Sequence, residues 1–385
     1  MSIRTSRCNE GLIWDEPRWH REHYKVVTEF GAVGDGKTDD TEAIQAAIDY
    51  HAGSLGDKHP GIVYFPPGVY RITKPLLLWK GMQLLCDPNP VKPPQWFDVE
   101  PIKATLLLSA KTAGYDNPDE PQPMVQLTSG SGQDVNDHQH HGNKDDGGGG
   151  NWVFHTAIRN LDCIVEEGNP GAVAAWWYGD HDVSIEHSRI QLKSGKAGIW
   201  MPDCWCGIRI HLYKCTIEGG DYGFYSDGWA MSSVLACHFA GQSKVSIALS
   251  NTWPSTLIKD CVFKDSHRFL LNDGFYLGGK EEEEEKYGGF MALNNHFETP
   301  TSEAAIEFKS GNLLLLNNTF KNCAWVIDNR LEGQADGDLE LASYFIGTSW
   351  DEGLVEHDGV LDGTFDTTSP DYSLADTFAD EGRAH

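Results

Sequence analysis

Short apolar strands recur along the middle of the chain, each followed by a polar step and a large apolar residue. We call that large residue the anchor, and the anchors are Ile164, Ile190, Ile217, Phe239, Phe263, Phe297 and Phe320. Consecutive anchors are 26, 27, 22, 24, 34 and 23 residues apart. One turn of a three-sided parallel β-helix needs about that many residues. The pattern therefore predicts an all-β, single-stranded, right-handed parallel β-helix, with an insertion at 278–289 that loops out of the longest repeat.

A second column of residues lies two positions before the anchors. Its members are Asp162, Ser188, Cys215, Cys237, Cys261, Asn295 and Asn318. Positions two apart in a strand share a face, so these side chains are expected to stack inside the solenoid. Stacked Asn side chains can hydrogen-bond along the axis, and Cys is a compact apolar filler. We expect free thiols here, although the spacing of the rungs also permits disulfides.

Another strand follows each anchor and ends in a polar residue. These polar residues are Asp180, Asp203, Asp227, Asn251 and Asp273. Aromatic residues lie beside them, and the ones we expect to bind substrate, together with Asn251, are Trp176, Trp177, Trp200, Tyr225, Trp229 and Trp253. If the repeats stack in register, both sets line one edge of the solenoid. Aromatic rings beside carboxylates are typical of a site that binds and cleaves a polysaccharide.

Paired carboxylates supply the acid and the base or nucleophile of glycoside hydrolysis. Side chains one or two rungs apart lie about 5–10 Å from each other, a range that fits both retaining and inverting hydrolysis. Asp203 and Asp227 are our first pair, Asp180 and Asp273 come next, and Glu218 is a further candidate. The alternative for each Asp is a turn or strand cap.

The segment at 26–72 differs from the repeats. Val26 to Phe30 is expected to form a strand, and GAVGDGKTDD a turn cluster. A helix at about 40–52 is expected to begin with Asp39 as its cap and Glu42 closing a capping box. The segment then continues as VYFPPGVY. This run resembles the N-terminal segment of the pectate-lyase superfamily, in the branch with rhamnogalacturonase-like and epimerase-like proteins.

The resemblance implies a β-helix whose open end is covered by the short helix, and an extracellular protein. It implies no single chemistry, because that superfamily includes hydrolases, lyases and non-catalytic binders. The paired-Asp and Gly-His-Gly signatures of polygalacturonases are absent. EGGDYGF at 218–224 and FAGQ at 239–242 are similar to rungs of β-helical exo-1,3-glucanases. Those enzymes have two β-helices, whereas this chain has room for one.

Two other functions stay open besides hydrolysis. A polysaccharide lyase acting on a uronate needs a base and a cation, which His187, Arg189 and Lys193 could supply, and such lyases often use Ca²⁺. A non-catalytic, tailspike-like glycan binder would be a homotrimer rather than a monomer. His138, His140 and His141 lie in a Gly-rich segment that we interpret as a loop, so no metal site and no cofactor is predicted outside the lyase alternative.

The net charge of −27 excludes nucleic acid as a partner, because the phosphate backbone would be repelled. No run of about 18 apolar residues exists, which predicts no membrane span. The N-terminus has no apolar stretch typical of a signal peptide, so the sequence itself supports no compartment. We expect an N-terminal extension at 1–25, the β-helix at 26–335, and an acidic tail or cap at 336–385.

Overall fold

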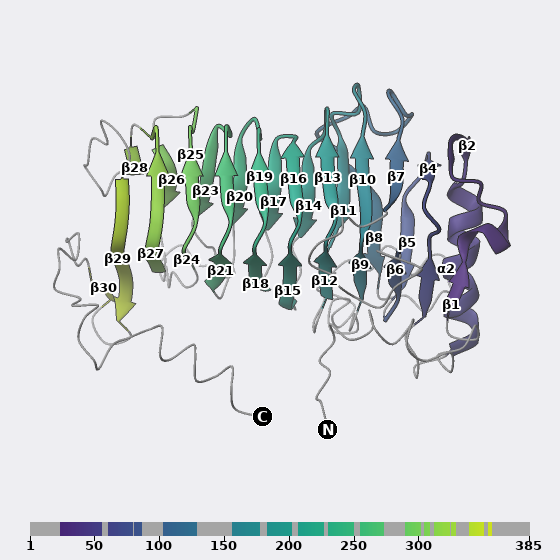
Figure 1. Cartoon of the computed structure of the whole chain (residues 1–385), viewed down its shortest axis with the longest axis horizontal. Coiled ribbons are helices and arrows are strands. Elements are labelled where there is room, and N and C mark those ends of the chain that lie inside the picture. The colour runs from purple at the N-terminus through teal and green to yellow at the C-terminus, as the bar shows by residue number, and fades with distance from the viewer. Residues whose placement is uncertain are drawn as a thin grey trace.

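The computed structural model of the protein describes residues 24–55, 61–79, 81–86, 103–128, 156–177, 183–201, 207–226, 230–249, 255–272, 289–301, 304–308, 312–323, 325–328, 339–349 and 353–355. Their strands form a right-handed parallel β-helix with three parallel sheets (Figure 1). Each strand pairs with the equivalent strand of the next turn. The predicted fold is therefore confirmed. No helix in these ranges is long and apolar enough to cross a membrane.

Strands of the three sheets follow one another in turn along the chain. The first sheet contains β1 (Tyr24–Val26), β3 (Ile62–Tyr64), β6 (Gln83–Leu85), β9 (Ala157–Arg159), β12 (Val183–Glu186), β15 (Gly207–Tyr213), β18 (Ala230–Leu235), β21 (Ser255–Lys259), β24 (Gly289–Leu293) and the first half of β27 (Asn312–Lys321). The second contains β2 (Asp35–Asp39), β4 (Val69–Ile72), β7 (Ala104–Leu108), β10 (Leu161–Val165), β13 (Arg189–Leu192), β16 (Thr216–Gly219), β19 (His238–Ala240), β22 (Val262–Lys264), β25 (His296–Glu298) and the second half of β27. The third contains β5 (Leu76–Trp79), β8 (Gln122–Thr128), β11 (Ala172–Trp176), β14 (Ala197–Met201), β17 (Tyr222–Ser226), β20 (Val245–Leu249), β23 (Arg268–Asn272), β26 (Ala304–Phe308) and β28 (Trp325–Asp328).

Both ends of the solenoid carry elements that break the repeat. At the N-terminal end, helix α2 (Thr41–Leu55) and the short 3-10 helix η2 (Val27–Phe30) lie beside the first strands (Figure 1). At the other end, β29 (Leu339–Ser349) pairs with β27 in the antiparallel direction, and β30 (Gly353–Val355) pairs with β29. Parallel strands therefore run from β1 to β28, and an antiparallel strand follows them.

Six of the seven predicted anchors stack in register inside the second sheet. Ile190 pairs with Ile217, Ile217 with Phe239, and the phenylalanines continue the column to Phe320. The rings of Phe239, Phe263, Phe297 and Phe320 lie 5.2, 4.8 and 4.7 Å apart and almost parallel. All of these side chains are buried.

Ile164 is not an anchor, because the strand that contains it pairs with the next rung one residue away from the register that the sequence pattern predicts. Cys163, not Ile164, pairs with Ile190. On each of the six rungs with a confirmed anchor, the bend before the second sheet contains a left-handed residue three positions before the anchor, and Asn160 takes that place here (φ 54°). Counting from Asn160 gives Cys163. Asp162 therefore faces outward, where it contacts Lys103 and accepts the Arg189 N–H.

The remaining predicted inner column forms a hydrogen-bond ladder. The backbone N–H of Cys261 donates to Oδ1 of Asn295 at 2.9 Å, and the N–H of Asn295 donates to Oδ1 of Asn318 at 2.9 Å. Nδ2 of Asn295 also donates to the Ile258 carbonyl. Cys215 and Cys237 continue the ladder through N–H to sulfur contacts of 3.4 Å. The Asn side chains of this column therefore have hydrogen-bond partners, as burial requires.

The thiols of the described residues are free and buried, as expected. They are Cys86, Cys163, Cys215, Cys237, Cys261 and Cys323. Burial raises the pKa of the Cys163 and Cys323 thiols to about 12. Neutral thiols of this kind are poor nucleophiles, so these residues fill the core.

The N-terminal cap differs from prediction in detail. The residues expected as one strand split into β1 and η2. Asp40, not Asp39, immediately precedes α2, and its carboxylate accepts the N–H groups of Val33 and Gly34. Asp39 instead accepts hydrogen bonds from Thr41 and Thr73, and Glu42 pairs with Lys74. Asp39 also accepts the backbone N–H of Thr41, the first residue of the helix, so its contact with the helix start is as predicted. Closure of a capping box by Glu42 is wrong, because Glu42 pairs with Lys74.

Replacing Asn295 with Ala should lower the free energy of unfolding by about 2–4 kcal/mol, because several buried hydrogen bonds lose a partner at once. Chemical denaturation would measure the change. Gln191→Ala, on the outer face of β13, is the control and should change stability by less than about 0.5 kcal/mol. An Asn295→Ala protein as stable as the wild type would contradict the role of the ladder.

Replacing Thr256 with Val should leave stability unchanged or raise it by about 1 kcal/mol. The Thr256 hydroxyl is buried without a hydrogen-bond partner, and Val has the same shape without the polar atom. Thermal unfolding would show the effect. A clear loss of stability would mean that the hydroxyl has a partner, such as a buried water.

Candidate active site

Three aromatic residues form a column on the outer face of the third sheet. Trp176 of β11 pairs with Trp200 of β14, which pairs with Tyr225 of β17. The next rung places Ala248 in the same column, and the preceding rung places Gln126 there. All three aromatic side chains are partly exposed, whereas Ala248 and Gln126 are buried. We call Trp176, Trp200 and Tyr225 the aromatic column.

The rings extend across the sheet as well as along it. Trp200 and Tyr225 have ring centroids 4.9 Å apart at an interplanar angle of 77°. Tyr222, at the start of β17, lies 5.0 Å from Tyr225 at 47°. The Trp200–Tyr225 contact is edge to face and the Tyr222–Tyr225 contact is tilted. Ring contacts of these kinds are favourable and hold the rings in fixed directions. The outer face therefore carries one connected group of rings.

Trp177 does not belong to this group. Its side chain is fully buried and forms part of the hydrophobic core. Because Trp176 faces outward, the following residue in the extended chain faces inward. The prediction that Trp177 binds substrate is therefore wrong.

Seven predicted site residues lie outside the described residues. They are Asp180, Asp203, Asp227, Asp273, Trp229, Asn251 and Trp253. Their segments connect the ends of β11, β14, β17, β20 and β23 to the next strands of the first sheet. The strands before them stay in register, since Met201, Ser226, Leu249 and Asn272 pair in succession. The roles of these residues stay predictions.

The first sheet carries a buried ion pair on the face that points away from the core. Nε of Arg159 lies 3.2 Å from Oε2 of Glu186 on the next rung. Gln83 accepts a hydrogen bond from Arg159, and Ser184 donates one to Glu186 at 2.8 Å. Burial alone would raise the pKa of the Glu186 carboxyl, but the Arg159 charge and these hydrogen bonds together hold it below its usual value. Glu186 is therefore ionised at neutral pH and is unsuited to donate a proton.

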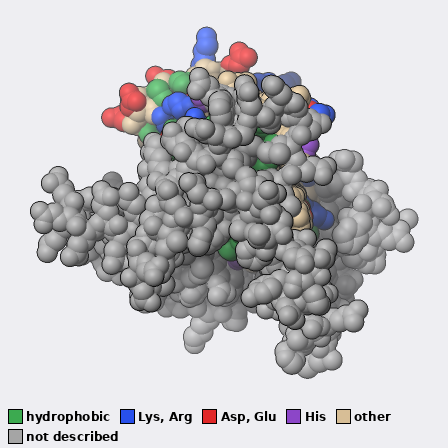
Figure 2. All heavy atoms as spheres, turned by 90° about the vertical axis from the view of Figure 1, so that its left-hand side faces the viewer, with side chains coloured by type: hydrophobic (Ala, Val, Ile, Leu, Met, Phe, Trp, Pro, Cys, Tyr) green, Lys and Arg blue, Asp and Glu red, His purple; other side chains and the backbone are tan. Residues whose placement is uncertain are grey.

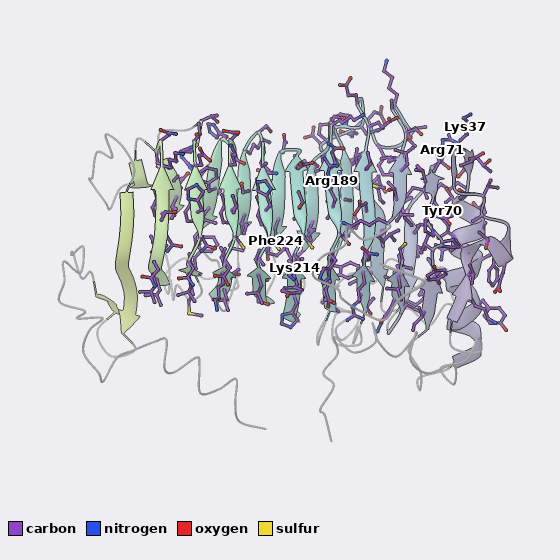
Figure 3. The ribbon with its side chains drawn as sticks, viewed as in Figure 1. Lys37, Tyr70, Arg71, Arg189, Lys214 and Phe224 are labelled. Atoms are coloured by element: carbon purple, nitrogen blue, oxygen red, sulfur yellow. The ribbon has the colours of Figure 1, made fainter. Side chains whose placement is uncertain are left out.

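The residues considered for a lyase, His187, Arg189 and Lys193, do not form one group, and each already contacts another residue. Arg189 forms an ion pair with Glu218 at 2.6 Å on the second sheet, so both candidates are engaged there. Lys193 lies 3.9 Å from Glu166. His187 occupies the bend before the second sheet, with its ring edge-to-face against Tyr213, and burial lowers its pKa below 6.5. Figure 3 shows Arg189 higher on the solenoid wall than Lys214, the bend residue one rung after His187.

Several exposed charges on the described surface are paired. Glu298 lies between Lys264 and Lys321 at 3.5 Å from each, and Asp221 lies 2.9 Å from Lys244. Seen from the C-terminal end, the upper rim of the molecule also places acidic and basic side chains close together (Figure 2). Within the described ranges no group of His, Cys, Asp or Glu side chains could hold a metal ion.

The sequence did not identify Tyr222 as a member of the ring group or Arg159 as the partner of Glu186. In a regular strand Tyr222 would share a face with Phe224. Here both Gly223 and Phe224 are buried, so Tyr222 and Tyr225 both face outward. The two glycines before Asp221, both at positive φ, were the only signal of this sharp bend. Arg159 had no sequence signal beyond a charge within an apolar strand.

Replacing Glu186 with Gln should destabilise the protein at neutral pH by about 1–3 kcal/mol, because Arg159 would remain buried without a counter-charge. The folded-state pKa of Glu186 is lowered, so its contribution is present above about pH 4.5 and is lost as the pH falls through the folded pKa. The stability difference between wild type and variant should therefore shrink below pH 4.5. Equal stability of the two proteins at pH 7 would contradict this role.

A family model described as "Rhamnogalacturonase A/epimerase, pectate lyase-like" matches residues 24–95. Among curated proteins, a probable glucan endo-1,3-beta-glucosidase of Arthroderma benhamiae is 43% identical over 225 residues, covering 52% of this chain and 21% of that protein. A glucan 1,3-beta-glucosidase of Cochliobolus carbonum is 27% identical over 364 residues, covering 85% of this chain and 40% of that protein. The chain thus spans well under half the length of these relatives.

Among solved structures, a tailspike protein of the E. coli bacteriophage HK620 is 11% identical, with a TM-score of 0.49, and covers 80% of this chain and 58% of its own. The register of the strands, the match at 24–95 and the likeness to the two glucosidases agree with one another. The chain therefore has the right-handed parallel β-helix fold, its residues 24–95 match a pectate-lyase-like family model, and it is similar to two glucan 1,3-β-glucosidases.

Proposed function

We propose that this β-helix is a glycoside hydrolase unit that binds a β-1,3-glucan on its third sheet. The observation that supports this most is the in-register aromatic column of Trp176, Trp200 and Tyr225. Flat, partly exposed rings fixed on a rigid sheet suit the apolar faces of pyranose rings. The likeness to two glucan 1,3-β-glucosidases supports a neutral glucan as the substrate.

For the chemistry we propose Asp203 and Asp227 as the carboxylate pair, with Asp180 and Asp273 as the next candidates. Asp203 and Asp227 follow β14 and β17, whose last residues Met201 and Ser226 are paired. The pairing of Met201 with Ser226 offsets Asp203 from Asp227 by one residue. Adjacent rungs are about 4.8 Å apart, so carboxyl groups that follow neighbouring strands can approach the roughly 5–5.5 Å separation of retaining enzymes. One carboxyl would protonate the leaving oxygen, and the other would attack the anomeric carbon.

Glu186 has a different role in this proposal, because the pKa of its carboxyl is lowered. Arg159 and Ser184 hold it ionised. It is therefore unsuited to act as the acid. Glu218 is likewise excluded from the catalytic pair, because Arg189 engages it on the second sheet.

A non-catalytic glycan binder would use the same aromatic column, so activity must be measured directly. Asp203→Asn and Asp227→Asn should each lower the hydrolysis rate by at least about 100-fold while the fold is kept. The reducing ends released from a β-1,3-glucan would report hydrolysis, and absorbance of unsaturated products would report a lyase. Glu218→Gln is the control. Full activity in both Asp variants would reject the pair.

Binding is tested separately from cleavage. Trp200→Ala should weaken binding of a β-1,3-gluco-oligosaccharide by about tenfold or more, since a stacking ring contributes about 1 kcal/mol beyond its buried area. Isothermal titration on the Asp203→Asn protein would measure it. Unchanged affinity would show that the glycan binds elsewhere. Whether the protein is a monomer or a homotrimer stays a prediction for a sizing column.

A further inference from the structure

We propose that Tyr222, Asp221 and Lys244 form an additional sugar subsite, so that the glycan crosses the third sheet along β17 instead of following the solenoid axis. This inference rests on the proposed function and extends it to residues at the opposite end of the strand. These residues lie where the chain bends from the second sheet into the third.

Tyr222 stands out from its neighbours along the axis. The residues paired with it are Ala197 on one rung and Val245 on the next. Both are small and buried, whereas the Tyr222 side chain is partly exposed. A large ring between two short side chains projects above them. Tyr222 therefore offers a ring where the adjacent rungs offer none.

The ring group is connected along the strand. Tyr222 contacts Tyr225 at 5.0 Å, and Tyr225 contacts Trp200 at 4.9 Å. Trp200 and Tyr225 meet edge to face, at 77°. Two sugars that follow one another along the axis could not both lie flat on these two rings. Trp200 and Tyr225 together therefore suit one sugar, and Tyr222 suits the next one along β17.

Polar groups beside Tyr222 match the hydroxyls at the rim of a pyranose. Oδ2 of Asp221 lies 2.9 Å from Nζ of Lys244, and Oδ1 accepts a hydrogen bond from Ser243 at 2.7 Å. The side chains of Asp221 and Lys244 are 30% and 49% exposed, so both can still reach a ligand. A carboxylate accepts from sugar hydroxyls and an ammonium group donates to them. Nζ of Lys244 also lies 5.4 Å from the centre of the Tyr222 ring.

A glycan that follows the solenoid axis has less support on the outer face of the third sheet. Beyond Tyr225 the aromatic column continues with Ala248, which is buried, and then with Leu271. Before Trp176 it contains Gln126, also buried. Among the described rungs of this column, a glycan along the axis would find rings only at Trp176, Trp200 and Tyr225. The rings of Trp200 and Tyr225 meet at 77°, so they do not form one continuous flat surface. A glycan along β17 would find rings and hydrogen-bonding groups in sequence.

The test compares a single sugar, methyl β-glucoside, with a β-1,3-linked glucose hexasaccharide on the Asp203→Asn protein, which should bind without cleaving. Methyl β-glucoside can fill the Trp200 and Tyr225 subsite alone, whereas the hexasaccharide also reaches Tyr222. Tyr222→Ala should weaken hexasaccharide binding by about tenfold and methyl β-glucoside binding by less than about twofold. Tyr222→Phe keeps the ring and should bind the hexasaccharide like its parent. Lys244→Met should weaken hexasaccharide binding by about threefold.

Tyr50→Ala is the matched control, because Tyr50 is a half-exposed tyrosine of the N-terminal helix. It should not change either affinity, and circular dichroism would confirm that each variant is folded. If Trp200→Ala loses binding while Tyr222→Ala binds both ligands like its parent, the subsite is wrong and the proposed function survives. If the parent does not bind the hexasaccharide, the subsite and the proposed glucan function both fail.

Discussion

Every feature of this protein depends on the parallel register between consecutive turns of the solenoid. Backbone hydrogen bonds place each residue directly over its equivalent about 4.8 Å away, so one side chain is repeated as a column. Inside, the column can be apolar, as in the Phe239 to Phe320 stack, with ring separations of 4.7–5.2 Å. It can also be polar if each residue forms hydrogen bonds with the next, as Asn295 and Asn318 do. A shift of one residue would reverse inside and outside for a whole strand.

The bends maintain that register. Left-handed residues precede the second sheet on seven rungs, and those residues are Asn160, His187, Lys214, Ala236, Asp260, Asn294 and Asn317. Their φ values lie between 51° and 56°. Several are not Gly or Asn, so the surrounding hydrogen bonds must offset the cost of this conformation. A bend of constant geometry gives strands that begin at the same level on each rung.

The same register organises the outer surface, where function is expected. It brings Trp176, Trp200 and Tyr225 together although they are about 25 residues apart in the chain. It also places Arg159 against Glu186 on the adjacent rung. These rings and charges are held in place by the strands of the first and third sheets and do not depend on a loop. The third-sheet strands that precede the connecting segments are aligned by the same register.

From the sequence alone, the repeat length, the anchor column and the polar inner column could be predicted, because they depend on a period that the chain displays directly. The sequence also located the aromatic residues at the ends of the third-sheet strands. Only the tertiary structure decided which residue of a pair faces the core, as Cys163 against Ile164 and Trp176 against Trp177 show. At a bend, two consecutive residues can both point inward, as Gly223 and Phe224 do, and simple alternation then fails. The reason is that the direction of a side chain depends on the geometry of the bend and on pairing with the neighbouring rung. That pairing joins residues far apart in the chain.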